Sequence, residues 1–251
     1  MSREIDKKQV FSSLIWKLLE RGGTQSVQFI VQIILARLLL PEDFGTVAIV
    51  LVFISLAQVF VQSGFNIALI QKKGADEIDF SSVFYLSLAV AGVLYVLIYF
   101  VTPFIAKFYG DQLLVPVLRV LSLTLFFGAL NSVQNAYIAK NMMFKKLFFS
   151  SLGAMIVSGI FGIVAAVSGL RVWALVIQQI VNQLTISIIL WFTVEWRPQL
   201  LFSFSRIKDL FSFGSKLLAS SLLNALYVDL RTLVIGLIYS PAMLGYYNRG
   251  Q

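Results

Sequence analysis

Five long stretches of this 251-residue chain contain no Asp, Glu, Lys or Arg, and this pattern restricts the possible folds more than any other feature. A helix needs about 20 mostly apolar residues to cross a lipid bilayer. The charge-free stretches are long enough, and they cover residues 44–71, 80–106, 120–139, 147–170 and 172–194. Two further stretches, about 12–40 and 207–239, are apolar but carry charges. The sequence therefore predicts an all-α, polytopic membrane bundle with seven candidate spans.

The composition excludes several classes of protein. Hydrophobic residues make up 59 % of the chain and charged residues 13 %, whereas soluble domains carry about 25 % charged residues. A water-soluble globule and a disordered chain are both excluded. The chain has no Cys and no His, which removes disulfides, thiol nucleophiles, Cys/His zinc sites and histidine bases. We therefore expect no metal site and no catalytic residue.

Basic residues alternate between the two sides of the predicted bundle. Lys and Arg are enriched in the cytoplasmic loops of membrane proteins. One side would hold eleven of them: Arg3, Lys7, Lys8, Lys72, Lys73, Lys140, Lys145, Lys146, Arg197, Arg206 and Lys208. The other side would hold five: Arg37, Lys107, Arg119, Arg171 and Arg249. This asymmetry predicts a cytoplasmic N-terminus, and because the charges are scattered among short loops we expect no nucleic-acid partner.

The first and last spans resemble each other. Each begins with Lys-Leu-Leu, and each is followed by Pro-x-x-(Phe or Leu)-Gly, from Pro41 to Gly45 and from Pro241 to Gly245. Six helices separate equivalent points, so the two copies point the same way, as in transporters with parallel repeats. The sequence predicts a six-helix lobe over residues 1–205. Residues 206–251 would then form the first helix of a second, incomplete lobe.

Polar side chains form stripes along several predicted spans. Residues three or four positions apart lie on one face of a helix, and amides or cations are costly when they face lipid. We therefore predict that these stripes border a cavity and bind substrate. The candidate residues are Arg21, Gln25, Gln28, Gln32, Gln58, Gln62, Asn66, Asn224, Tyr227 and Arg231.

Other polar residues are expected to hold helices together. Polar groups between membrane helices commonly hydrogen-bond across the interface, each contributing about 0.6 kcal/mol. We assign this role to the polar residues of the fourth and sixth spans, namely Thr124, Asn131, Gln134, Asn135, Gln178, Gln179, Asn182, Gln183 and Thr185. In the fifth span, Ala154, Ser158, Gly162 and Ala165 form a ridge of small residues that predicts close helix packing.

The charges within the predicted spans suggest the kind of cargo. Lys17, Arg21, Lys216 and Arg231 outnumber Glu20 and Asp229. A cationic cavity would attract an anion, and Arg can hold a phosphate through two parallel hydrogen bonds. Asp229 lies on the opposite face of its helix from the polar stripe, and the sequence offers no role for it.

Three segments carry a resemblance to a known family: ARLLLPEDFG at 36–45, QSGFNIALIQKK at 62–73 and SPAMLGYYNRGQ at 240–251. They resemble the Wzx-type lipid-linked oligosaccharide flippases of the multidrug/oligosaccharidyl-lipid/polysaccharide exporter superfamily, in particular the colanic and teichuronic acid exporters. The resemblance implies two six-helix lobes around a central cavity. It also implies alternating access and location in the bacterial cytoplasmic membrane. Arg21 resembles a basic residue that faces the cavity in that family.

The resemblance further implies the substrate and its partners. The cargo would be an undecaprenyl-pyrophosphate-linked glycan in membrane lipid, delivered to and from glycosyltransferase and glycan polymerase machinery. No cofactor is implied, although coupling to a proton or a sodium ion is possible. Related drug exporters often carry an Asp in the first helix for ion coupling, and here only Glu20 lies nearby.

Two other functions stay open. A cation-coupled multidrug exporter would share the architecture, but it favours an anionic cavity, and the predicted stripes are cationic. A membrane enzyme such as a glycan polymerase or ligase would need acid–base residues in a sizeable external loop. The only external acids are Glu42, Asp43 and Asp111, and the first two are better explained as first-turn acids of a helix. We therefore expect a transporter and not an enzyme.

Overall fold

The computed structural model describes residues 7–72, 74–238 and 241–249. Arg3, Lys73, Ser240 and Gln251, which contributed to the sequence predictions, lie outside the described residues. All regular structure within the described ranges is helical. The helices are α1 (Lys7–Leu38), α2 (Pro41–Gln71), α3 (Glu77–Tyr109), α4 (Leu114–Leu121), α5 (Thr124–Lys140), α6 (Phe144–Val167), α7 (Val172–Thr193), α8 (Phe204–Ile238) and α9 (Pro241–Arg249). The predicted all-α class is confirmed.

Local sequence signals set the ends of these helices. Proline at the first position of α2 has a backbone angle suited to a helix start, and the Asp43 carboxylate accepts a hydrogen bond from the Leu40 backbone N–H at 3.1 Å. At the start of α3, Asp76 and Asp79 accept reciprocal hydrogen bonds from each other's backbone N–H groups at 3.0 and 3.2 Å. Gly110 ends α3 with a positive φ of 69°, a conformation that glycine adopts without strain.

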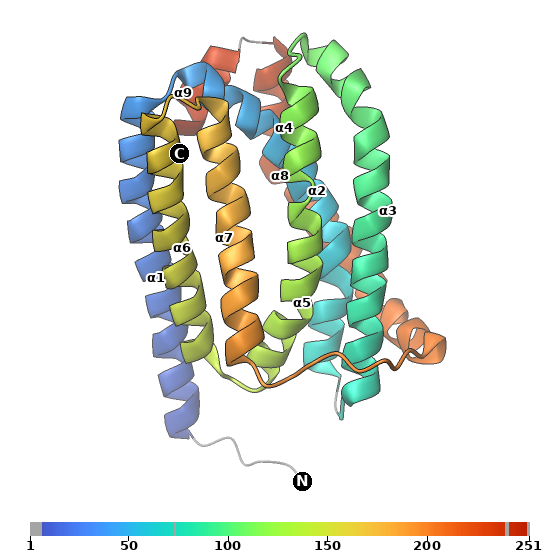
Figure 1. The fold of residues 1–251 in the computed structure, drawn as a ribbon. Helices are drawn as coiled ribbons and strands as arrows, with labels where there is room; N and C mark the ends of the chain where they lie inside the picture. Colours follow the sequence, from blue (N-terminus) through green and yellow to red (C-terminus); the bar gives the residue numbers. More distant parts are fainter. Residues whose placement is uncertain (1–6, 73, 239–240, 250–251) are drawn as a thin grey trace.

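The helices run up and down through one bundle (Figure 1). The α1–α2, α3–α4 and α6–α7 connections lie at one end, here called the upper end. The α2–α3, α5–α6 and α7–α8 connections lie at the other, called the lower end. Helix α1 packs beside α6, α6 packs on α7, and α2 lies against both α5 and α8. This alternation is the topology that a chain with repeated membrane crossings requires.

Six of the described helical segments are long and apolar enough to cross a membrane, against the seven spans predicted from sequence. Helix α1 is not among them because it carries charges and amides along one face. It nevertheless packs against α6 through much of the bundle's height (Figure 1). The predicted span at 120–139 begins earlier, at Leu114, and is interrupted near Ser122 between α4 and α5.

The ridge of small residues on α6 is confirmed as a packing surface. Ala154, Ser158, Gly162 and Ala165 are all buried. A Cβ on Gly162 would lie 3.0 Å from the Gln178 Cβ of α7, so the glycine allows these two helices to approach closely. By contrast, α3 exposes large apolar side chains such as Val93, Phe100 and Phe104, as expected of a helix that faces lipid.

Helix α2 contacts α8 and α9 at glycines. Gly64 of α2 faces Gly214 of α8, and a Cβ on either residue would lie within 2.9 Å of the other's carbonyl oxygen. At the upper end, a Cβ on Gly245 of α9 would collide with the carbonyl oxygen of Pro41. Pro41 and Gly245 belong to the two copies of the Pro-x-x-(Phe or Leu)-Gly motif, so the repeated motifs meet at a backbone contact.

Candidate substrate cavity

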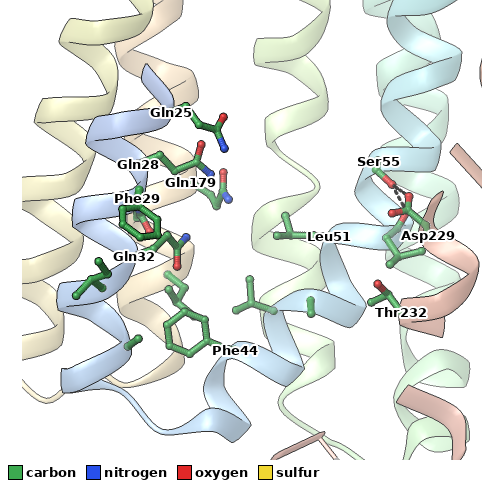
Figure 2. Close-up of a pocket in the computed structure, with 17 residues that line it drawn as sticks. Gln25, Gln28, Phe29, Gln32, Phe44, Leu51, Ser55, Gln179, Asp229 and Thr232 are labelled. Carbon is green, nitrogen blue, oxygen red and sulfur yellow. Dashed lines mark hydrogen bonds between the residues drawn. The ribbon is translucent and has the colours of Figure 1, made fainter. Parts of the chain in front are cut away.

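A cavity of about 550 Å³ lies between α1, α2, α7 and α8, in the half of the bundle nearer the upper end (Figure 2). Its position follows from the bundle, because α1 and α2 diverge after their short connection (Figure 1) and residues of α7 and α8 complete the lining. The residues that line it are Gln25, Gln28, Phe29, Gln32, Ile33, Ala36, Phe44, Val47, Ala48, Leu51, Val52, Ser55, Leu175, Gln178, Gln179, Asp229 and Thr232.

One wall of the cavity is rich in side-chain amides. Gln25, Gln28 and Gln32 project from one face of α1, and Gln179 of α7 points into the same space (Figure 2). Within the described part of the chain, these four amides make no hydrogen bond to another protein group. Each amide has two N–H donors and an acceptor oxygen. The wall therefore offers unoccupied donors and acceptors to a polar ligand.

The opposite wall carries a carboxyl group. Asp229 of α8 lies beside Ser55 of α2, and the Ser55 hydroxyl oxygen is 2.5 Å from Asp229 Oδ2 (Figure 2). The same hydroxyl oxygen is 2.8 Å from the Val52 carbonyl oxygen. Thr232, one turn further along α8, also lines the cavity. Among the described lining residues, Asp229 is the one charged side chain, so this cavity differs from the cationic one expected from sequence.

The structure brings together three of the ten predicted site residues. Gln25, Gln28 and Gln32 share the cavity wall. Gln58 instead connects two helices, because its amide donates to the Thr124 carbonyl of α5 at 3.0 Å; its oxygen accepts from Gln62, on the same helix α2, at 2.6 Å. These two residues therefore contribute to packing between α2 and α5. Asn66, one turn further, has a buried side-chain oxygen without a hydrogen-bond partner in the described residues.

The other four predicted residues lie outside this cavity. Arg21 is exposed one turn before Gln25, and Asn224, Tyr227 and Arg231 are exposed on α8, with Tyr227 73 % exposed. For the three residues of α8, the reason is the rotation of this helix about its axis. Its smaller face, which includes Gly214, packs on α2, and this turns Asp229 and Thr232 toward the cavity and the predicted stripe away from it. A binding role for these four residues stays a prediction.

Two of the interhelical bonds expected for the fourth and sixth spans are present, whereas the buried amide of Gln134 has no hydrogen-bond partner in the described residues. Asn182 of α7 donates to Ser158 of α6 at 3.2 Å, and Asn131 of α5 donates to Gln183 of α7 at 3.5 Å. Gln178 and Gln179, however, line the cavity, a role that the sequence reasoning missed. The amides of α7 occupy two faces of the helix, and the sequence did not show which face meets another helix.

Asp229 and Ser55 were also missed as cavity residues. The signal for Asp229 was present in the sequence, because an ionisable residue inside a membrane span is commonly functional. Its position opposite the polar stripe argued against it. That argument assumed that the stripe, and not the face with Asp229, would border the cavity.

A bundle of long apolar helices around an amide-lined cavity defines a polytopic membrane protein, and a solved structure shows the same fold. The fold is similar to the inward-facing conformation of a multidrug resistance MATE family transporter of the MOP superfamily, with a TM-score of 0.61 and 18 % sequence identity. The similarity covers 92 % of this chain and 60 % of that one.

Residues 34–251 match the family model described as "Polysaccharide biosynthesis protein", and the chain belongs to this family. It is 27 % identical to the teichuronic acid biosynthesis protein TuaB of Bacillus subtilis, over 96 % of this chain and 50 % of TuaB. It is 26 % identical to the succinoglycan biosynthesis transport protein ExoT of Rhizobium meliloti, over 89 % of this chain and 45 % of ExoT.

The lipopolysaccharide biosynthesis protein WzxC of Escherichia coli is also 26 % identical, over 86 % of this chain and 44 % of WzxC. The chain spans about half the length of these relatives. The predicted resemblance to polysaccharide exporters is confirmed.

Proposed function

We propose that the protein containing this chain moves an undecaprenyl-pyrophosphate-linked glycan from the cytoplasmic to the outer leaflet of the bacterial cytoplasmic membrane. Family membership supports a role in polysaccharide production. The apolar helices support action within the membrane. ExoT, whose name describes a transport protein, supports transport over catalysis. The protein would act after the glycosyltransferases that build the lipid-linked glycan and before a polymerase, and would itself be no enzyme.

The observation that carries this proposal is the row of unbonded amides in the cavity. Gln25, Gln28 and Gln32 follow one another along α1, so a ligand moving along the cavity would meet an amide at each turn. Sugar hydroxyls both donate and accept hydrogen bonds, as amides do. Exchange of partners along such a wall costs little free energy, because each bond that breaks can be replaced by a similar one.

We also propose the lobe arrangement and the orientation. Residues 1–205 would form the first lobe and residues 206–251 would begin the second, with the N-terminus in the cytoplasm. The backbone contact between Pro41, which opens the first copy of the repeated motif, and Gly245, which closes the second copy, supports a division of this kind. Arg21 lies on α1 on the lower side of the amide row, where it would meet the pyrophosphate of a lipid-linked glycan near the cytoplasmic surface.

A transport assay tests the proposal. The full protein would be reconstituted in liposomes with a fluorescent lipid-linked oligosaccharide, and movement between leaflets would be followed by a membrane-impermeant quencher. We expect the Gln28→Leu/Gln32→Leu double variant to lose at least about 90 % of the flipping rate, equivalent to roughly 1.4 kcal/mol in the barrier. Gln112→Leu, the same change in the exposed α3–α4 loop, should keep the wild-type rate.

The proposal is wrong if the wild-type protein does not speed flipping above protein-free liposomes. The proposed binding site is wrong if the double variant and Gln112→Leu move the lipid-linked oligosaccharide between leaflets at equal rates. Wild-type flipping with a fully active double variant would direct attention to Arg21 and to the exposed stripe of α8.

A second candidate function is a cation-coupled exporter of cationic drugs. One observation favours it: the charged residue of the described cavity lining is an acid, Asp229. The same liposomes distinguish the two functions. Uptake of a cationic dye without movement of the lipid-linked oligosaccharide would favour the drug exporter, and the reverse result would favour the flippase.

A further inference from the structure

Arg119 is a cation within a membrane-spanning segment, on a side of the bundle that the cavity does not use. It lies near the end of α4, in the apolar segment Leu114–Lys140. Leu118 and Leu121 of α4 are buried in the core, and Arg119 projects from another side of this helix toward α3. An ionisable residue within a span commonly has a function, so its partner has to be identified.

The helix lengths give the depth of Arg119 in a bilayer. The segment Leu114–Lys140 has 27 residues, which is about 40 Å, so a centred span extends about 5 Å beyond each side of a 30 Å hydrocarbon core. Arg119 follows Leu114 by about 8 Å along the helix axis, so its Cα lies about 3 Å inside the core boundary. The same calculation for Tyr99 on the 33-residue α3 gives about 5 Å. The Arg119 guanidinium is therefore within reach of lipid phosphates at the upper end.

The guanidinium is stacked on an aromatic ring. Its central carbon lies 3.9 Å from the centroid of the Tyr99 ring. One terminal nitrogen donates to the Tyr99 carbonyl oxygen at 3.4 Å, which is long for a hydrogen bond. Nε is buried and has no hydrogen-bond partner within the described residues. Because stacking covers only a face of the guanidinium, N–H groups in its plane stay available to an acceptor.

The described acids do not balance the charge of Arg119. Asp111, the acid nearest to it in the sequence, accepts hydrogen bonds from the Thr46 hydroxyl at 2.8 Å and from the Leu113 backbone N–H at 2.9 Å. Among the described residues, Arg119 forms no ion pair with a carboxylate. A charge at this depth is costly unless an anion accompanies it. The site therefore suits an anion that the membrane itself can supply.

The surface beside Arg119 is suited to acyl chains. Phe100, whose ring centroid lies 5.8 Å from that of Tyr99, is 68 % exposed, and Phe104, one turn further along α3, is 74 % exposed. Leu123, one turn beyond Arg119, is also exposed. Phe126 of α5 packs against Tyr95 of α3, with the ring centroids 5.5 Å apart, and so joins the two sides of the seam between these segments. A cation at the phosphate level and an apolar surface below it match the two parts of a lipid.

We infer that Arg119 binds the phosphate group of an anionic lipid at the seam between α3 and α4, in the leaflet at the upper end. The terminal N–H groups would hold the phosphate through parallel hydrogen bonds, and the acyl chains would lie along Phe100, Phe104 and Leu123. An anionic phospholipid and a lipid-linked pyrophosphate share this chemistry. The bound lipid would hold α3 against α4 just above the interruption near Ser122. This site does not depend on the proposed function.

Photocrosslinking from the seam tests the inference. Benzoylphenylalanine would replace Leu123 in the full protein, in bilayers with equal amounts of phosphatidylglycerol and phosphatidylcholine that have identical acyl chains. Phe161, an exposed residue on the outer face of α6 in the same half of the bundle, is the control position. After irradiation, mass spectrometry would give the ratio of the two lipid adducts. We expect the phosphatidylglycerol ratio to be about fivefold higher from position 123 than from position 161.

Two substitutions assign the preference to Arg119. Arg119→Leu should reduce the ratio at position 123 to that at position 161. Lys107→Leu removes an exposed cation from the same wall of α3 and should leave the ratio unchanged. Equal ratios at the two positions in the wild type would overturn the inference, and this comparison stands even if Arg119→Leu does not fold. Equal losses in the two substituted proteins would also overturn it, because they would indicate a general attraction of anionic lipid to basic residues.

A second mixture identifies the source of the phosphate. A polyprenyl-pyrophosphate-linked oligosaccharide would be added to the same bilayers. Its appearance in adducts from position 123, with loss of the phosphatidylglycerol adduct, would support the phosphate site with the lipid-linked pyrophosphate as its ligand. Persistence of the phosphatidylglycerol adduct would support the site with a phospholipid as its ligand. Flipping measured in the same bilayers tests the proposed function separately, because a phosphate site without flipping would refute the flippase and keep the lipid site.

Discussion

At the lower end of the bundle, charged side chains around the start of α3 bond to one another, whereas in the cavity nearer the upper end most polar side chains do not bond to other protein groups. The lower end holds an ion-pair cluster, which consists of Lys72, Asp76, Asp79 and Arg206. Asp79 is fully buried and lies 2.7 Å from Lys72 Nζ and 3.7 Å from an Arg206 nitrogen. Arg206 also lies 3.2 Å from Asp76. In the cavity, by contrast, the amides of α1 make no hydrogen bond to another protein group within the described residues.

Further bonds at the lower end fix the segment that precedes α8. The Trp196 indole donates to Glu77 at 2.8 Å, and the backbone N–H groups of Gln199 and Ser203 donate to the hydroxyls of two serines in α3, Ser81 and Ser82. Satisfied polar groups hold a structure in one arrangement, and unsatisfied ones are available to ligands and water. The comparison teaches that bonded polar groups at the lower end fix the position where α8 begins. The unbonded amides of the cavity stay available to bind a ligand.

The largest expected effect on stability comes from Asp79→Ala in the ion-pair cluster. The substitution leaves Lys72 and Arg206 without this partner and removes the acceptor of the Asp76 backbone N–H. Lys72 and Arg206 are partly exposed and become hydrated when Asp79 is removed, so we expect a loss of about 2–3 kcal/mol, below the roughly 3–5 kcal/mol of a fully buried pair. Unfolding in mixed detergent micelles measures the loss, with the exposed Asp209→Ala as the control. A loss below about 1 kcal/mol would show that the cluster does not stabilise the bundle.

The next effect is expected at the crossing of α2 and α9. Gly245→Ala would place a Cβ against the Pro41 carbonyl oxygen, so the two helices must separate. Overpacking of this kind costs about 1–3 kcal/mol. Gly92→Ala is the matched control, because no atom lies within 4 Å of the added Cβ on α3. The same unfolding assay applies, and equal stability of the two variants would argue against a tight crossing.

A smaller effect concerns pH. The hydrogen bond from the Asp79 backbone N–H, assisted by the charge of Arg206, lowers the pKa of Asp76 below its ordinary value. The stabilisation from Asp76 is therefore present above the unfolded-state pKa of about 4 and is lost as the pH falls through the lower, folded-state pKa. Asp76 is solvent-accessible, so the effect is modest. Asp76→Asn should reduce the fall in melting temperature upon acidification; an unchanged acid profile would contradict this.

The smallest effect on stability is expected in the cavity. Gln28 has no hydrogen-bond partner to lose within the described residues, so Gln28→Leu should change the unfolding free energy by no more than about 0.5 kcal/mol. The comparison between the two regions predicts that this variant folds normally and transports poorly. A melting temperature as low as that of Asp79→Ala would mean that the amide row is structural.

The sequence predicted the helices well because the signal was strong. Charge-free stretches that can span a bilayer leave few alternatives, and the ridge from Ala154 to Ala165 indicated its own packing face. Helix ends differed by a few residues, and the interruption at Ser122 was not foreseen. The residues around Ser122 are of the same apolar and small types that occur in a continuous helix. The amino-acid composition of this segment therefore does not reveal the interruption between α4 and α5.

The cavity was predicted only in part. The α1 amides were found because one face of that helix holds them all. Asp229 and Ser55 were missed because the face that α8 turns toward the cavity is set by its contact with α2 at Gly214. The spacing of polar residues along α8 does not show which of its faces makes this contact. Gln58 was assigned to the cavity, but its amide donates a hydrogen bond to the Thr124 carbonyl. The assignment was wrong because a stripe of amides can line either a helix interface or a cavity, and the sequence does not distinguish the two.

The central claim is that the space between the α1 amides and Asp229 is a water-filled path, and the lack of cysteine in this chain makes a direct measurement simple. Gln28→Cys would be introduced into the full protein, with any cysteine elsewhere replaced, and exposed to a membrane-impermeant maleimide. Val93→Cys on the outer face of α3 and Gln112→Cys in a loop are the negative and positive controls. Maleimides need a hydrated thiolate. We predict that Gln28→Cys reacts like Gln112→Cys and is protected by lipid-linked glycan; a thiol as unreactive as that of Val93→Cys would contradict the account.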